Sequence, residues 1–159
     1  MLHVLLLSEH NSSRGRIACK YLHELGGDFF SIECTGLEPR PLNPLVALVM
    51  REEGYRLNDS NGSSSAVDLV KMERRYDIVI TMCSRESCLQ CPAFPKCALR
   101  LHWSHDDPGT FAGNRIDRLQ KTRTIREGIK ADVINLIRAY QENGRNMLVN
   151  HYLITPNLQ

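Results

Sequence analysis

The stretch His3 to Leu22, HVLLLSEHNSSRGRIACKYL, decides the fold that the rest of the sequence completes. Its aliphatic run, Val4 to Leu7, stops at Ser8 and is followed by a polar loop, Glu9 to Ser13. After Arg14 and Gly15, apolar residues recur at helical spacing, at Ile17, Ala18, Tyr21, Leu22 and Leu25. The pattern therefore predicts a strand, a short polar loop and a helix in direct succession.

A junction of this kind favours the binding of a negatively charged group. The backbone N–H groups of the loop and the N-terminus of the helix point at one spot, where the positive end of the helix dipole lies. Arg14, at the end of the loop, can add a planar, bidentate contact to an oxyanion. The candidate oxyanion-binding residues are Glu9, His10, Asn11, Ser12, Ser13 and Arg14.

The composition is that of one globular domain. Of the 159 residues, 42% are hydrophobic and 24% are charged, which is ordinary for such a domain. A formal net charge of +2 without a basic run gives no support for nucleic-acid binding. No stretch approaches the roughly 20 apolar residues of a membrane span. We expect a cytoplasmic protein with a domain at 1–144 and a C-terminal tail at 145–159, with strand character over 147–154.

The remaining segments alternate between strand and helix patterns. Strands are expected at 29–34, 77–82 and 99–103, and helices at 45–53, 66–74 and from Asn114 to Gly144. Asn43 before Pro44 is an N-cap pattern, and Gly26-Gly27 suits a left-handed C-cap. One face of the last helix is expected to be buried, with Ile116, Leu119, Ile125, Ile129, Val133, Leu136, Ile137 and Tyr140.

The order β-α-β-α-α-β-β-α predicts a three-layer α/β domain, with a four-stranded parallel sheet and helices on both faces. Ligands of such sheets bind at the carboxyl ends of the strands. The loop after the first strand, the segment after Met82 and the loop Asp106-Asp107-Pro108 are expected to meet at that edge.

Several segments, in order, resemble the low-molecular-weight protein tyrosine phosphatases and the thioredoxin-coupled arsenate reductases. Ser8-x5-Arg14 has the spacing of their Cys-x5-Arg loop, and Cys34-Thr35-Gly36-Leu37-Glu38-Pro39 is similar to their Ser-Ala-Gly-x-x-Pro segment. The strand 77–82 followed by Cys83 is similar to an arsenate reductase strand that ends in a reactive cysteine. Cys91-Pro92-x-x-Pro95 and His102-Trp103-x-x-Asp106-Asp107-Pro108 resemble the arsenate reductases more than the phosphatases.

The resemblance implies the fold of that family and chemistry at phosphorus or arsenic. In the family the loop cysteine attacks, the arginine holds the oxyanion and an aspartate protonates the leaving oxygen. By position, Ser8 corresponds to the nucleophile, Arg14 to the arginine that holds the oxyanion and Asp107 to the general acid. Asp107 can also simply cap its loop. The implied ligand is phosphate, arsenate or a similar oxyanion, and the implied redox partner is thioredoxin.

The loop also departs from the family pattern. Ser8 replaces the cysteine, and an alcohol is a far weaker nucleophile than a thiolate unless a base activates it. Gly15 replaces the serine that usually follows the arginine, and Glu9 adds a carboxylate that opposes an anion. We therefore expect an oxyanion-binding protein in which catalysis is impaired or absent. Two alternatives stay open: a Cys-to-Ser variant of an active enzyme, and a Ser8 that His10 activates.

Cysteines stand at positions 19, 34, 83, 88, 91 and 97, and without an export signal we expect no disulfide framework. Cys19 and Cys34 are interpreted as packing residues. The resemblance implies a disulfide relay among Cys83, Cys88 and Cys91. The spacing alone also permits a zinc or iron–sulfur site on Cys83, Cys88, Cys91 and Cys97, or thiols without a joint role. A metal- or redox-responsive binding protein is therefore the non-enzyme alternative.

Overall fold

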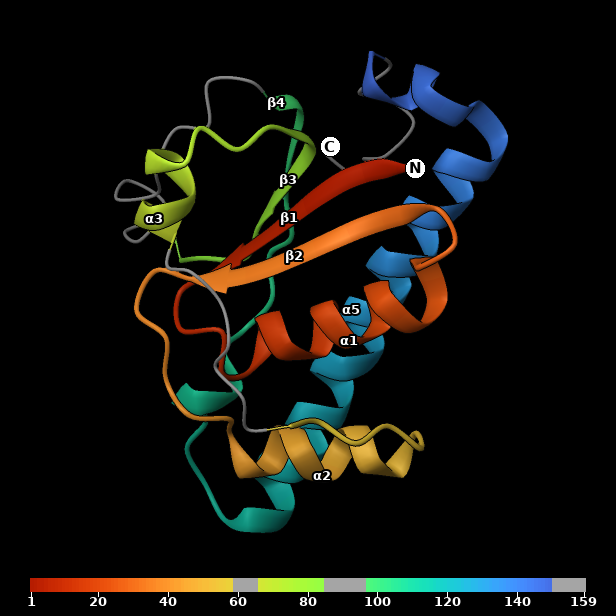
Figure 1. The fold of residues 1–159 in the computed structure, drawn as a ribbon. Helices are drawn as coiled ribbons and strands as arrows, with labels where there is room; N and C mark the ends of the chain where they lie inside the picture. The colour runs from red at the N-terminus through yellow and green to blue at the C-terminus, as the bar shows by residue number, and fades with distance from the viewer. Residues whose placement is uncertain (59–65, 85–96, 150–159) are drawn as a thin grey trace.

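The computed structural model describes residues 1–58, 66–84 and 97–149. The described chain follows the expected alternation of strands and helices (Figure 1). Its elements are β1 (Leu2–Ser8), α1 (Arg14–Gly26), β2 (Phe30–Gly36), α2 (Pro44–Glu52), α3 (Ala66–Lys71), β3 (Tyr76–Thr81), β4 (Cys97–His102) and α5 (Arg115–Asn143). Two short 3-10 helices, η1 (Pro108–Thr110) and η2 (Gly144–Leu148), lie on either side of α5 in the sequence.

The four strands form one parallel sheet in the order β2-β1-β3-β4. Strand β1 is central, because Leu5 lies opposite Glu33 of β2 and Val79 of β3. Almost all of β1 is buried, and burial on both faces explains its uninterrupted aliphatic run. The carboxyl ends of the strands share one edge of the sheet, where Ser8 lies opposite Gly36.

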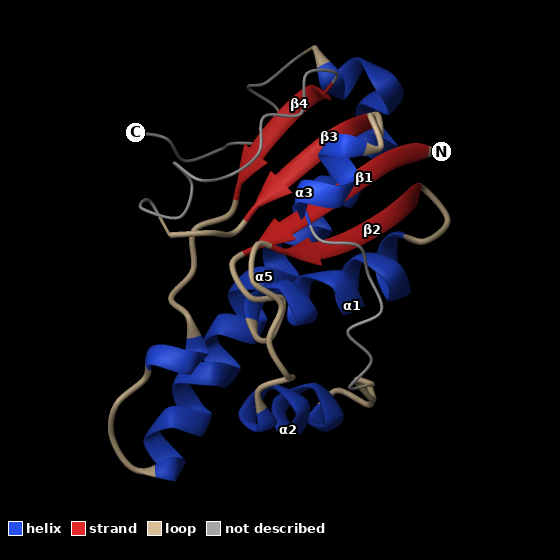
Figure 2. Cartoon of the chain, turned by 60° about the vertical axis from the view of Figure 1, so that its left-hand side comes forward, coloured by secondary structure: helices blue, strands red, loops and turns tan. Residues whose placement is uncertain are grey.

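Helices cover both faces of the sheet (Figure 2). Helices α1 and α5 pack together on one face, α2 packs against α5, and α3 lies on the other face. Because side chains alternate along a strand, β1 contributes to two cores. Val4 and Leu6 belong to the larger core with α1, α2 and α5, whereas Leu5 and Leu7 pack with Leu69 of α3. The predicted three-layer α/β fold with a four-stranded parallel sheet is confirmed.

The ends of the helices test the expected capping residues. The Asn43 side chain accepts a hydrogen bond from the Leu45 N–H at 3.0 Å, so this N-cap is confirmed. Asn114 likewise caps α5 by accepting from the Asp117 N–H at 2.9 Å. The left-handed C-cap of α1 was a wrong prediction, since Gly27 has a φ of −60°. Ile116 does not join the buried face of α5, because the first turn projects past the sheet and leaves its side chain 78% exposed.

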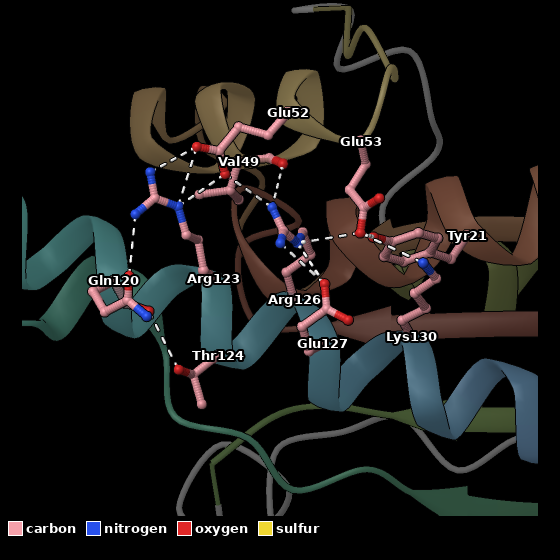
Figure 3. A network of polar contacts seen from close by, with 10 residues as sticks. All are labelled: Tyr21, Val49, Glu52, Glu53, Gln120, Arg123, Thr124, Arg126, Glu127 and Lys130. Carbon is pink, nitrogen blue, oxygen red and sulfur yellow. Dashed lines mark hydrogen bonds and ion pairs between the residues drawn. The ribbon is translucent and has the colours of Figure 1, made fainter.

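A network of ion pairs joins α2 to α5 (Figure 3). Glu52 accepts hydrogen bonds from Arg123 Nη2 at 2.7 Å and from Arg126 Nη1 at 3.0 Å. Arg126 also donates to the Val49 carbonyl at 2.8 Å. Glu53 and Lys130 extend the network, with Nζ 3.5 Å from the carboxylate. These contacts fix α2 on α5, and with it the far end of the segment that connects β2 to α2.

The last described residues form η2 and not a strand. Met147 is fully buried in the larger core, which ties this short helix to the domain. The predicted strand character is therefore wrong for 147–148, and residues 150–159 lie outside the described part. Within the described ranges, no helix combines the length and the apolar character needed to span a membrane.

Candidate functional site

The loop between β1 and α1 is held from outside by the segment that follows β2. Four backbone N–H groups of this segment donate to loop carbonyls at 2.8 to 3.0 Å: Leu37 to Ser8, Glu38 to Glu9, Arg40 to His10 and Asn43 to Ser12. Because these carbonyls are turned outward and satisfied, the inner side of the loop is left to its N–H groups. Asn11, with a left-handed φ of 47°, reverses the chain in the middle of the loop.

Ser8 lies at the floor of the loop and is 3% exposed. Its Oγ accepts a hydrogen bond from the Asn11 N–H at 3.0 Å. A Cβ placed on Gly15 would lie only 2.8 Å from the Ser8 Cβ and would also overlap the Ser8 hydroxyl. A side chain at position 15 would therefore need the space that Ser8 occupies, and glycine avoids this overlap.

Two further polar groups of the loop, Ser13 and the side-chain oxygen of Asn11, are buried. Ser13 is 5% exposed, and its Oγ accepts a hydrogen bond from Asn43 Nδ2 at 3.3 Å. The side-chain oxygen of Asn11 is buried and, among the described residues, has no hydrogen-bond partner. A buried acceptor without a donor is unfavourable, and a water or a protonated oxyanion would satisfy it.

Arg14 begins α1, and its side chain is only 10% exposed. Nη1 donates a hydrogen bond to the His105 carbonyl at 2.8 Å. Nη2 lies 3.9 Å from a carboxylate oxygen of Asp107 and 4.0 Å from one of Glu9. The guanidinium is thus oriented by one backbone acceptor and flanked by two carboxylates that offset its charge.

Asp107, at the predicted general-acid position, has two roles in the structure. One carboxylate oxygen accepts from the Gly109 N–H at 2.9 Å and caps η1. The other oxygen faces Arg14. The sequence left two roles open for Asp107: a cap of its loop or a carboxylate at the site. In the structure the one side chain has both positions.

His105 was not predicted as a site residue, yet it positions Arg14. Its Nε2 lies 2.5 Å from an Asp132 carboxylate oxygen on α5, and its ring lies against Gly128, where a Cβ would be 3.0 Å from the ring. Helix α5 therefore holds the residue whose carbonyl orients the guanidinium. No sequence signal marks this contact, because it joins a loop to a helix far along the chain.

His102, at the end of β4, lies near the positive charge of Arg14. Burial lowers the pKa of its imidazole, and the nearby Arg14 cation lowers that pKa further. The ring Nδ1 lies 2.9 Å from the Thr81 hydroxyl. His102 is therefore neutral near pH 7 and adds no positive charge beside Arg14.

Residues 8–15 and Asp107 line a shallow pocket of about 10 Å³, which is room for about one water molecule. The carboxylates of Glu9 and Asp107, 4.0 and 3.9 Å from Arg14 Nη2, would compete with an oxyanion for the guanidinium. The Arg14 guanidinium therefore lies at this pocket with two carboxylates already beside it.

The alternative in which His10 activates Ser8 finds no support. His10 Nδ1 lies 3.1 Å from the Glu38 carbonyl, in the segment outside the loop. The Ser8 hydroxyl contacts the Asn11 N–H instead.

The predicted metal site on four cysteines is contradicted by the strand register. Cys97 begins β4 opposite Tyr76, at the amino end of β3, whereas Cys83 follows the carboxyl end of that strand at Thr81. At about 3.3 Å per strand residue, about 20 Å separate the two. Cys83 and Cys97 cannot ligate one ion, while Cys88 and Cys91 lie outside the described residues.

Cys19 and Cys34 are not simply packing residues, as predicted from the sequence. They form a disulfide between α1 and β2, with Cα atoms 6.2 Å apart. The pairing arises because α1 packs on β2, a contact that no spacing in the sequence encodes.

The fold and the loop define an α/β protein of the low-molecular-weight phosphatase and arsenate reductase architecture. No protein-family model and no curated protein matches the chain, but solved structures do. An arsenate reductase in the phosphate binding state matches with a TM-score of 0.66 and 24% identity, over 87% of this chain and 98% of that one. A low-molecular-weight phosphotyrosine phosphatase from Vibrio cholerae O395 matches with a TM-score of 0.67 and 17% identity, over 91% and 99%.

A thioredoxin-dependent arsenate reductase from Corynebacterium glutamicum is also similar, with a TM-score of 0.64 and 23% identity. That match covers 89% of this chain and 63% of the other. At these identities the likeness establishes the fold, and the expectation of this architecture is confirmed.

Proposed function

We propose that the chain binds a tetrahedral oxyanion, phosphate or arsenate, in the loop Glu9 to Arg14. The observation that carries the proposal is that the segment 37–43 satisfies the loop carbonyls from outside, while the buried Arg14 guanidinium lies at the inner side of the loop. A solved structural neighbour is described in a phosphate binding state, which supports the same ligand class.

The second part of the proposal is that catalysis is absent or strongly reduced. A phosphatase-type loop can lower the pKa of a thiol, ordinarily about 8.5, enough to keep it as a thiolate. A serine hydroxyl in the same place stays protonated, and the described contacts supply no base for it. The Asn11 N–H at 3.0 Å from Ser8 Oγ donates to the hydroxyl and does not remove its proton.

The glycine at position 15 supports a natural serine over a Cys-to-Ser variant of an active enzyme. A change at one position would leave the serine that usually follows the arginine in place. Here position 15 is glycine, and the Ser8 side chain fills the space beside it. Position 15 therefore differs from the family pattern as well as position 8, as expected when a loop changes without selection for turnover.

The redox part of the resemblance stays a prediction. One structural neighbour is thioredoxin-dependent, and Cys83 lies directly after β3, 3% exposed, with its Sγ donating to the Leu7 carbonyl at 3.9 Å. A relay through Cys83, Cys88 and Cys91 would make thioredoxin a partner. The cytoplasmic location likewise stays a prediction.

Turnover assays test the proposal that Ser8 removes catalysis. The unmodified chain, Ser8→Ala and Ser8→Cys are compared for arsenate reduction with a dithiol and for hydrolysis of an aryl phosphate. We expect the unmodified chain to match Ser8→Ala, and Ser8→Cys to exceed both. Turnover by the unmodified chain that Ser8→Ala abolishes would show that Ser8 is a working nucleophile and would overturn this part of the proposal.

A further inference from the structure

The disulfide between Cys19 and Cys34 lies beside a histidine on the same face of α1. Cys19 and His23 are four residues apart on the helix, so their side chains project from one face. Cys34 approaches from β2, on which α1 packs. Both cysteines are partly buried and His23 is exposed, so solvent reaches the group from the His23 side.

The three side chains form a compact set of metal ligands. Among the described residues, the two sulfurs and a ring nitrogen of His23 lie within 4.8 Å of one another. Zinc binds thiolate at about 2.3 Å and imidazole at about 2.0–2.1 Å, so tetrahedral ligand atoms lie about 3.3–3.8 Å apart. Once the S–S bond is open, small side-chain movements suffice to surround one ion.

The surroundings suit such a site. Cys19 and Cys34 pack against the larger core, which keeps water from the inner side of the sulfurs. Lys20, the nearest lysine on the helix, is paired with Glu24 at 2.5 Å, and this offsets its repulsion of a cation. None of the three residues lines the pocket formed by residues 8–15 and Asp107.

We propose that Cys19, His23 and Cys34 bind one zinc ion when the disulfide is reduced, so that the metal and the disulfide exclude each other. A dithiol reductant opens the S–S bond by supplying two electrons and two protons, and is itself oxidised to a disulfide. The two thiols release these protons when Zn²⁺ binds as the thiolate complex. Three protein ligands leave the fourth position to water, as in open zinc sites.

Cobalt, a spectroscopic substitute for zinc, tests the site directly. The full chain and a variant with Cys88, Cys91 and Cys97 changed to Ser are reduced with a phosphine and titrated anaerobically with Co²⁺. We expect one equivalent to bind in both, with thiolate charge-transfer absorption and tetrahedral visible bands, and none to bind to the oxidised chain. Zinc added afterwards displaces the cobalt and gives its affinity.

Two variants identify the ligands. Cys19→Ser should abolish the charge-transfer absorption, and His23→Ala should weaken zinc binding by at least about tenfold. His3→Ala is the matched control, because His3 is exposed on β1 and is not among the three grouped ligands. The proposal would be overturned if binding persists in Cys19→Ser or is unchanged in His23→Ala. It would also be overturned if the oxidised chain binds equally well, or if binding is lost in the variant without Cys88, Cys91 and Cys97.

Discussion

The side chain of Ser8 fills the space beside Gly15, so that a Cβ at position 15 would lie 2.8 Å from the Ser8 Cβ. This relationship joins the last residue of β1 to the first turn of α1, across the floor of the loop 9–13. In this structure a side chain at position 15 would therefore overlap Ser8 unless one of the two residues shifts.

Gly15→Ala is therefore expected to lower the free energy of unfolding by about 1–3 kcal/mol, as an overpacking substitution. In the double variant Ser8→Gly/Gly15→Ala the overlap disappears. We expect the alanine at position 15 to cost less in the Ser8→Gly background than in the unmodified chain, so the two changes couple. Denaturant unfolding of the four chains measures this coupling, and strictly additive effects would contradict the proposed contact.

Glu9 is expected to weaken anion binding, because its carboxylate lies 4.0 Å from Arg14 Nη2 and competes for the guanidinium. Glu9→Gln should tighten phosphate binding by up to about fivefold, the range of a partly exposed ion pair. Glu38→Gln, an exposed carboxylate in the neighbouring segment, is the matched control and should leave the affinity unchanged. Weaker binding by Glu9→Gln would mean that this carboxylate supports the ligand and does not oppose it.

Asp132 is expected to act as a positioning residue through His105. Asp132→Asn removes the charge that holds the His105 ring, and so loosens the carbonyl that orients Arg14. We expect phosphate affinity to fall by up to about fivefold, with the loop still able to bind. Calorimetric titration measures this, and Glu142→Gln, an exposed change on the same helix, controls for charge. Unchanged affinity would limit Asp132 to a structural role.

The ion-pair network between α2 and α5 makes stability depend on pH. The hydrogen bond from Arg123 lowers the pKa of Glu52 below its usual 4.5, with a further contribution from Arg126. A lowered folded-state pKa stabilises the protein above the unfolded pKa and loses that effect as the pH falls through the folded pKa. Glu52→Gln should therefore lower the Tm at pH 7, and the difference should shrink below pH 4.5. A difference that is the same at both pH values would exclude this linkage.

The fold could be predicted from the sequence because its signals are local. The aliphatic run of β1, the Asn43 and Asn114 caps and the order of strands and helices each depend on neighbouring residues. Arg14 and Asp107 could also be placed at the site, since both follow strand ends at one edge of a parallel sheet. Motif spacing and topology were sufficient for these residues.

The contacts that the sequence did not reveal join elements far apart in the chain. The Cys19–Cys34 disulfide depends on how α1 packs on β2, and the His105–Asp132 pair on how α5 crosses behind the loop. The prediction of a four-cysteine metal site was wrong for the opposite reason, because closeness in sequence was taken for closeness in space. Cys83 and Cys97 are close in sequence, but the parallel register places them at opposite ends of β3 and β4.

The most direct test of oxyanion binding is a calorimetric titration of the unmodified chain with phosphate, beside Arg14→Ala and Arg40→Ala. Arg40 is the matched control, because its backbone supports the loop while its side chain is 60% exposed. The structure predicts saturable one-site binding by the unmodified and Arg40→Ala chains, and its loss in Arg14→Ala. No binding by the unmodified chain at millimolar phosphate, or equal binding by Arg14→Ala, would contradict the proposed anion site.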